Sequence, residues 1–453
     1  MSTHKIRVCT LLFFSGLYGL HGQVNGTRAP SVMFDSVVTV WSEFGHGTGF
    51  IVDKKGLILT SQSVIGPSEI ITVQFDPQHK VAATLLAADN EKDIAVLWAN
   101  LAPCPNCVAA PIAGVDRKPT PVAVGDRIVA VSSPMGPLKA TASGIVSGLD
   151  SESIASDIET DAWIAGGPVF NAQGTVIGLT SAAGQIKPGR GPSRIVPIGK
   201  ASALLDEART KLTASTAPAA TLLPVESADV FPHDALEQVM EEKKFDFRSY
   251  FFDEGDYRVT LVTPIFIYRL RTGIKNEDEK RQAKHKGRTI EPTPDVTEIW
   301  GLKNWAPYLA EYTPVIEIMA TSHMRETTKS ILGRALAGGV YSEPWQMKFK
   351  TDFYRMELKC GEKEIQPIQA GKVKEVVDDS HQFTKVVNSS SMGFYSYPPD
   401  AISPSCGQVT LELHSLKDPD KATAKVLEGK TVERIWEDFE PYRKATGTSP
   451  KMQ

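Results

Sequence analysis

The sequence predicts a mainly β protein built in two parts, and three observations support this. Between residues 37 and 205, short apolar runs such as SVVTVW, GTGFIV and LILTS are separated by Gly, Pro, Asn and Asp, a pattern typical of short strands joined by turns. Residues 354–360 and 409–413 alternate apolar and polar side chains, which predicts strands with one face on a core. The length of 453 residues exceeds that of one ordinary compact domain.

The composition is that of an ordinary globular protein. Hydrophobic residues make up 42% of the chain, and the formal net charge is -4. The absence of a broad positive excess argues against nucleic acid as a partner, so we expect a protein or a peptide. No spacing of metal ligands and no phosphate-binding glycine loop stands out, and we therefore predict neither a metal nor a cofactor. The sequence leaves the oligomeric state open.

The first 26 residues predict a secretory signal peptide. Lys5 and Arg7 precede an apolar run over 8–20, which is followed by a small polar segment up to Gly26. The apolar run is too short to span a bilayer comfortably, so we expect export to the periplasm or the exterior. No stable membrane span is expected after removal of the signal, and an uncleaved anchor is the alternative. Cys9 lies at the start of the run, which argues against an acylated lipoprotein.

The rest of the chain divides by composition. Residues 27–212 predict an all-β domain that ends in a helix, and residues 213–228 (TASTAPAATLLPVESA) predict a linker because they are small, contain Pro and lack periodicity. Residues 229–446 predict a β-sandwich with inserted helices, and residues 447–453 a tail.

Helices are predicted at three places. Apolar residues recur at helical spacing over 198–212, a first-turn proline at Pro232 indicates a short helix, and a further helix is expected over 324–336. The mixed-charge run 275–288 predicts a solvated loop or an exposed helix, with a docking patch as the alternative.

Four cysteines remain after the signal, an even number that suits an oxidising compartment. Cys104 and Cys107 form CPNC, for which we expect a local disulfide, with a zinc or a redox site as alternatives. Cys360 ends one alternating strand and Cys406 precedes the other, so a bridge between them would clamp a sheet.

Seven motifs occur in a characteristic order. They are GHGTGFIV, GLILTSQSVIG, KDIAVLW, VAVGDRIVAVSSPMGP, ATASGIVSGL, ETDAWIAGGPVFNAQGTVIGL and IVPIGKASALL. In this order, residues 37–205 resemble the trypsin-like serine peptidases of the HtrA type. The resemblance implies two β-barrels packed face to face with a cleft between them. Residues after the linker do not resemble the PDZ domains that such peptidases usually carry.

The resemblance also implies where catalytic residues would stand, and the motifs there are altered. Ser63 occupies the place of the histidine base, and a hydroxyl has no basicity near neutral pH. Asp93 stands at the place of the triad aspartate. Ala165 runs directly into Gly166 and Gly167, so the Gly-Asn-Ser part of the nucleophile loop is missing, together with the serine and the oxyanion-hole amides. We expect a tight turn over 163–168.

No other residues have a motif that would replace the lost group. His46 is expected in a surface loop, His79 at a hairpin tip, and Ser132 and Ser133 in a structural turn. We therefore predict an exported, non-catalytic trypsin-fold protein, a pseudo-peptidase that acts as a binding or scaffold module. The alternative is an active HtrA-like serine endopeptidase with a relocated nucleophile.

Overall fold

The computed structural model describes residues 31–447, apart from 44, 113–121, 134–138, 159–163, 182–192, 215–220, 228, 240–244, 285–291, 294, 296–311, 324, 327–344, 351 and 382–383. The expected signal peptide and residues 448–453 of the expected tail lie outside the described residues. Within the described ranges, no helix is both long and apolar enough to cross a membrane.

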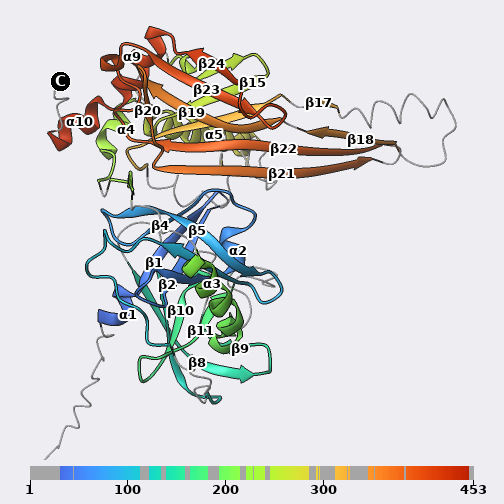
Figure 1. Ribbon diagram of the computed structural model, residues 1–453. Coiled ribbons are helices and arrows are strands. Elements are labelled where there is room, and N and C mark those ends of the chain that lie inside the picture. The colour runs from blue at the N-terminus through green and yellow to red at the C-terminus, as the bar shows by residue number, and fades with distance from the viewer. Residues whose placement is uncertain are drawn as a thin grey trace, which may run out of the picture.

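The first part of the chain forms two closed barrels of six antiparallel strands each (Figure 1), as the resemblance implied. The first barrel contains β1 (Val37–Ser42), β2 (Gly45–Ile51), β3 (Leu57–Thr60), β4 (Ile71–Gln74), β5 (Lys80–Asp89) and β6 (Ile94–Ala99). The second contains β7 (Arg127–Ser132), β8 (Ala140–Leu149), β9 (Ile154–Ser156), β10 (Pro168–Asn171), β11 (Val176–Ser181) and β12 (Ser193–Pro197). The 3₁₀ helix η2 (Ile198–Ala201) and helix α3 (Ser202–Ala214) follow, which confirms the helix predicted there.

The second part of the chain contains two sheets and several helices. The larger sheet has the order β14 (Phe251–Glu254), β15 (Tyr257–Val262), β16 (Ile316–Ser322), β22 (Thr384–Tyr397), β18 (Trp345–Lys350) and β17 (Arg325–Glu326), and β21 (Gln369–His381) also pairs with β22. The smaller sheet has the order β20 (Lys363–Ile365), β19 (Phe353–Cys360), β23 (Val409–Ser415) and β24 (Ala422–Val426). The main helices are α4 (His233–Val239), α5 (Pro264–Lys284), α9 (Gly429–Asp438) and α10 (Glu440–Thr446).

The two sheets bury their apolar faces in a common hydrophobic cluster. Leu358, Leu411 and Leu413 of the smaller sheet and Ile318 and Phe394 of the larger sheet all belong to it. The alternation of apolar and polar residues in the sequence therefore identified the buried face of β19 and β23, and the mainly β architecture with inserted helices is confirmed.

Both expected cysteine pairs are bonded in the structure. Cys104 is joined to Cys107, and Cys360 at the end of β19 is joined to Cys406, which ends the 3₁₀ helix η5 (Pro404–Cys406) just before β23. Because β19 and β23 are neighbours in the smaller sheet, the second bridge fixes the same pair of strands covalently.

The segment 213–228, expected to be a linker, contributes strand β13 (Leu222–Leu223). Strand β5 is longer than its partner β6: residues 83–89 close the barrel on β6, and Lys80 and Val81 pair with β13 on the same side. A pairing of two residues produces no periodicity, so the sequence could not reveal it. The segment 213–228 is therefore partly attached to the first barrel through the pairing of β13 with β5.

The helix predicted over 324–336 is wrong at its start. Arg325 and Glu326 form β17, which pairs antiparallel with β18, and the rest of the predicted helix lies outside the described residues. Pairing with a neighbouring strand overrides a local helical pattern at such positions. Of the stretch 275–288, predicted to be exposed, residues 275–284 form the last part of helix α5.

The first barrel packs directly against the C-terminal sheets (Figure 1), and Trp41 of β1 is the apolar centre of that contact. Trp41 is 2% exposed and belongs to the same hydrophobic cluster as the C-terminal sheets. Its indole Nε1 donates to Oε1 of Gln74 at 3.0 Å. Truncation of a buried Trp to Ala typically costs roughly 3–5 kcal/mol, so loss of this side chain should strongly destabilise the folded protein.

Lys80, the first residue of β5, is fully buried in the same contact. Its ammonium group donates to the main-chain oxygen of Ile368 at 2.8 Å, lies 3.6 Å from Oε1 of Glu226 and 5.2 Å from the ring centre of Trp41. Glu226 also accepts a hydrogen bond from Nε2 of Gln369. Burial lowers the pKa of Lys80 to about 8, although the Glu226 carboxylate opposes this shift.

A second polar group crosses the contact at Lys372 of β21. Its main-chain N–H donates to the Glu43 carbonyl at 2.7 Å, and its ammonium group lies 3.0 Å from Oε1 of the same residue. Oε2 of Glu43 accepts the main-chain N–H of Glu69 at 2.8 Å. Glu43 is 2% exposed and the Lys372 side chain is 21% exposed, so this ion pair is partly shielded from water.

We predict that the contribution of Lys80 to the stability of the protein rises as the pH rises through its titration. Its folded-state pKa of about 8 lies below the ordinary value of 10.5, so between these values the unfolded chain binds the proton more strongly. The contribution of Lys80 to the free energy of unfolding therefore increases over this interval, by roughly 1–3 kcal/mol. Urea unfolding of wild type and Lys80→Met at pH 7.5 and 10 measures the effect as a difference that the variant lacks.

Lys54→Met is the matched control because Lys54 is exposed, and it should keep the wild-type pH dependence. An identical pH dependence in wild type and Lys80→Met would contradict the prediction.

Candidate functional site

The resemblance implies catalytic residues at certain positions of the sequence. The structure places these positions on neighbouring elements of the two barrels. Ser63 lies in the short helix α2 (Gln62–Ile65) that follows β3, and Asp93 immediately precedes β6, both in the first barrel. Ala165, Gly166 and Gly167 precede β10 of the second barrel. Ser63 is exposed, whereas Asp93 and Ala165 are buried.

Both carboxylate oxygens of Asp93 are occupied by hydroxyl and amide donors. Oδ1 accepts the main-chain N–H of Ser63 at 2.7 Å, and Oδ2 accepts the hydroxyls of Ser63 at 3.2 Å and Ser181 at 2.5 Å. The Ser61 hydroxyl lies 2.7 Å from that of Ser63. A triad aspartate holds an imidazole N–H, but within the described part of the chain no histidine donates to Asp93.

The backbone amides of Gly166 and Gly167 are also occupied. The N–H of Gly166 donates to the Thr180 carbonyl at 2.8 Å, and the N–H of Gly167 donates to the Ile164 carbonyl at 3.0 Å and lies 3.1 Å from Oγ1 of Thr180. An oxyanion hole needs amides that point at the substrate oxygen, and these two point into the protein. The bond between Gly167 and Ile164 closes a tight turn, while Trp163, where the expected turn begins, lies outside the described residues.

Gly166 lets the loop pass against the first barrel at close range. Its φ is +83°, and a Cβ atom there would lie 2.2 Å from the Thr48 carbonyl oxygen and 2.4 Å from Oγ1 of Thr60. The neighbouring Ala165 is 3% exposed, and its carbonyl accepts the N–H of Thr48 at 2.9 Å. The segment that holds Ala165 and Gly166 is thus a packed structural link between the two barrels.

The two histidines of this part of the chain do not join the group. His46, expected in a surface loop, instead lies in strand β2 with its ring 4.9 Å from that of Trp41. Its Nδ1 is buried without a hydrogen-bond partner among the described residues, and burial lowers the pKa of its imidazole to about 4. His79 lies in the β4–β5 connection, as expected, with Nδ1 2.8 Å from Oδ2 of Asp76.

Ser132 and Ser133 have structural contacts. Ser132 ends β7, and Ser133 joins the barrels because its hydroxyl lies 2.6 Å from that of Thr39 and its N–H donates to Oγ1 of Thr48 at 3.1 Å. Sequence reasoning missed Ser181, the donor from β11 that completes the contacts of Asp93. A serine at the end of a strand carries no motif, so its role becomes visible only when the two barrels are assembled.

The chemistry available at this group is limited. It contains one carboxylate and several hydroxyls, and a carboxylate is a much weaker base than an imidazole at neutral pH. Within the described residues it therefore offers hydrogen bonding and structural cohesion, but no base that could activate a serine.

We predict that Gly166→Ala strongly destabilises the protein, by roughly 3 kcal/mol or more, because the new methyl group would overlap main-chain atoms of the first barrel. Gly125→Ala is a matched control: Gly125 also has a positive φ, of +94°, but nothing lies within 4 Å of its Cβ position. The control should lose only about 1 kcal/mol. Equal losses for the two variants in urea unfolding would show that the loop is not packed as described.

Comparison with known proteins supports the architecture. Residues 47–179 match the family model of the trypsin-like peptidase domain. A probable periplasmic serine endoprotease of the DegP-like type from Hahella chejuensis is 34% identical over 143 residues, which is 30% of this chain and 29% of that protein. The periplasmic pH-dependent serine endoprotease DegQ of Escherichia coli is 34% identical over 157 residues, 32% of this chain and 33% of its own.

This chain therefore spans about a third of the length of these curated relatives. Among solved structures, the serine endoprotease from Yersinia pestis aligns with 38% of this chain and 62% of its own at 25% identity, with a TM-score of 0.33 that is too low to carry an argument. The assignment depends on the family match and on the two six-stranded barrels. The chain contains a trypsin-like peptidase domain, and this domain is related to those of the HtrA-type proteins.

Proposed function

We propose that the chain is an exported, non-catalytic member of the trypsin fold, a pseudo-peptidase whose double barrel supports the C-terminal sheets. The observation that carries this proposal is the environment of Asp93. Its carboxylate is saturated by Ser63 and Ser181, in the place where a peptidase would hold its histidine base.

The loss extends to every part of the acyl-transfer machinery. Ser63 supplies no base, the sequence around Ala165 lacks a nucleophile, and the amides of Gly166 and Gly167 are used inside the protein. Loss of a single triad member typically lowers the rate by about 10⁴- to 10⁶-fold, and losses in several parts leave little catalysis beyond binding.

The contact between the first barrel and the C-terminal sheets favours a scaffold role. Trp41 is built into the core of those sheets, and Lys80 and Lys372 form ion pairs across the boundary. A buried contact of this kind holds one orientation, because separating the parts would expose an indole and leave Glu226 and Glu43 without their cations. The barrels would thus present the C-terminal sheets in a fixed position.

Export and a protein partner complete the proposal. The relatives are named periplasmic serine endoproteases, and this chain has two disulfides, which persist in oxidising compartments. We propose that the cleft implied by the trypsin-type fold holds an extended peptide by strand addition. We therefore propose protein or peptide as the partner class.

Activity-based labelling tests the proposal directly. We expect no labelling by a fluorophosphonate probe and no cleavage of an unfolded protein substrate, because the described group around Asp93 contains no base that could activate a serine. The DegQ protein of Escherichia coli serves as the positive control. Labelling and cleavage that are both abolished by one Ser→Ala substitution would overturn the proposal and establish the alternative, an active endopeptidase with a relocated nucleophile.

A Ser63→His variant tests the loss of the histidine base separately from the loss of the nucleophile loop. Ser63→His would place an imidazole beside Asp93, but we expect it to produce no cleavage because the nucleophile and the oxyanion amides are still missing. Measurable turnover of the unfolded substrate by Ser63→His would show that a working nucleophile persists elsewhere in the chain, contrary to the proposal.

A further inference from the structure

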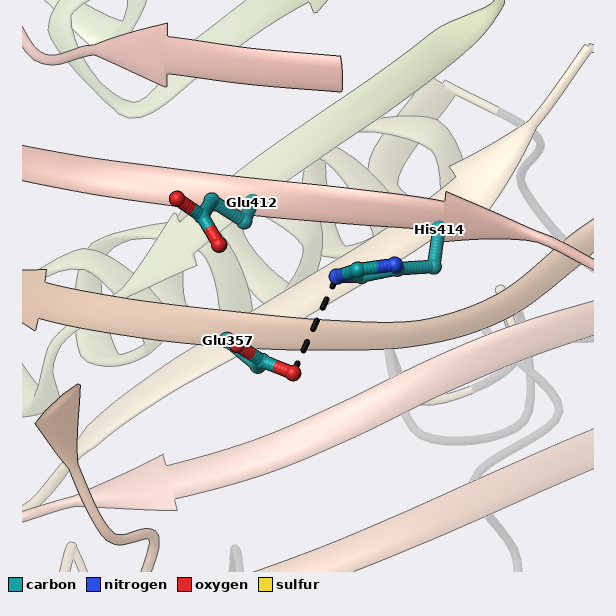
Figure 2. Close-up of side chains that lie close together, drawn as sticks. All are labelled: Glu357, Glu412 and His414. Atoms are coloured by element: carbon teal, nitrogen blue, oxygen red, sulfur yellow. Dashed lines mark ion pairs between the residues drawn. The ribbon is translucent and has the colours of Figure 1, made fainter. Parts of the chain in front are cut away.

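Three side chains with metal-binding atoms meet on the polar face of the smaller C-terminal sheet (Figure 2). Glu357 lies on β19, directly opposite Glu412 of β23 in the strand register, and His414 follows two residues later on the same face. The alternate residues Leu411 and Leu413 face the hydrophobic cluster. The strand pairing therefore brings the two carboxylates and the imidazole together on the face turned away from the core.

The tautomer of His414 leaves one nitrogen available. Its Nδ1 lies 2.7 Å from the main-chain oxygen of Pro419, and because a carbonyl only accepts hydrogen bonds, Nδ1 must carry the proton. The lone pair of the neutral ring is then on Nε2. This atom is buried, has no hydrogen-bond partner among the described residues, and lies 3.7 Å from Oε1 of Glu357. Metal-binding histidines are commonly oriented by such a bond to a carbonyl.

His414 is only 4% exposed, which makes its unpartnered nitrogen notable. A buried polar atom without a partner costs free energy, roughly 1–3 kcal/mol for an ordinary group. Glu357 cannot satisfy Nε2 when the ring is neutral, because a carboxylate is also an acceptor. A cation between the two would satisfy both.

The carboxylates have weak competing partners. Arg355 lies 3.0 Å from Oε1 of Glu357 and Lys359 lies 2.7 Å from Oε1 of Glu412, and both cationic side chains are partly exposed. Solvent-accessible pairs of this kind contribute about 0–1 kcal/mol, so a bound metal ion can displace them. They also offset the repulsion between two directly opposed glutamates in the metal-free protein.

We propose that Glu357, Glu412 and His414 bind a divalent transition-metal ion, with Zn²⁺ as the preferred ion. Their ligand atoms lie within 4.8 Å of one another, and tetrahedral zinc with bonds of roughly 2.0–2.2 Å places its ligands about 3.3 Å apart. Small rotations of the two glutamate side chains close this difference. The imidazole favours zinc over Ca²⁺ or Mg²⁺, which take oxygen ligands, and a fourth position would remain for water.

Metal titration of the untagged, oxidised protein after treatment with a chelator tests the site. We expect one Zn²⁺ per chain by isothermal titration calorimetry, with affinity in the micromolar range or better. His414→Gln should weaken binding by roughly 100-fold or more, and Glu357→Gln and Glu412→Gln by roughly 10-fold or more. Co²⁺ should give the visible absorption of a four-coordinate site, and His414→Gln should abolish it.

His79→Gln is the matched control, because His79 also contacts a carboxylate, that of Asp76, but lies outside the proposed cluster. It should bind Zn²⁺ like the wild type. The near-isosteric glutamine variants at the two glutamates keep the test valid if His414→Gln fails to fold, as thermal unfolding without metal will show. Failure of the wild type to bind Zn²⁺, or unchanged affinity in the folded cluster variants, would overturn the proposal.

Discussion

The burial of Trp41 and Lys80 against the C-terminal sheets is the constraint on which the arrangement of the whole chain depends. Both residues belong to strands of the first barrel, yet Trp41 belongs to the core of the other part and Lys80 donates to its backbone. A fully buried ammonium group is tolerated only with close partners, and Ile368 and Glu226 provide them. The outer face of the barrel therefore acts as a part of the C-terminal core.

The region around Asp93 and Gly166 is held by contacts between the two barrels. Asp93 accepts hydrogen bonds from serines of both barrels, and Gly166 allows a close approach of the chain to the first barrel. Each interaction helps to hold the two barrels together. Both residues therefore have structural roles at these positions.

The sequence predicted the parts of the structure that depend on long, repeated patterns. The ordered motifs identified the double barrel, and the alternation around Leu358 and Leu411 identified the inward face of the second part. Features that depend on contacts between distant segments were missed. Strand β13 consists of only two residues, Ser181 becomes a partner of Asp93 only when the barrels meet, and the ring of His46 packs against that of Trp41 on the neighbouring strand.

The same limit applies to the cluster on the smaller sheet. Glu412 and His414 are two residues apart, which suggests a shared face of a strand, but Glu357 lies more than fifty residues away in the chain. Only the register of β19 against β23 places it opposite Glu412. A site that is assembled from several strands has no local spacing of ligands by which the sequence could predict it.

Strand β13 has a consequence for how the molecule comes apart. Residues 222–223 are paired with β5, and Glu226 is tied to Lys80 a few residues later, so part of the connecting chain is integrated into the fold. If either part unfolded, the residues against which the other part packs would no longer be in place. The two parts should therefore unfold in one cooperative transition, with a mechanical rigidity closer to that of a single domain than of two tethered ones.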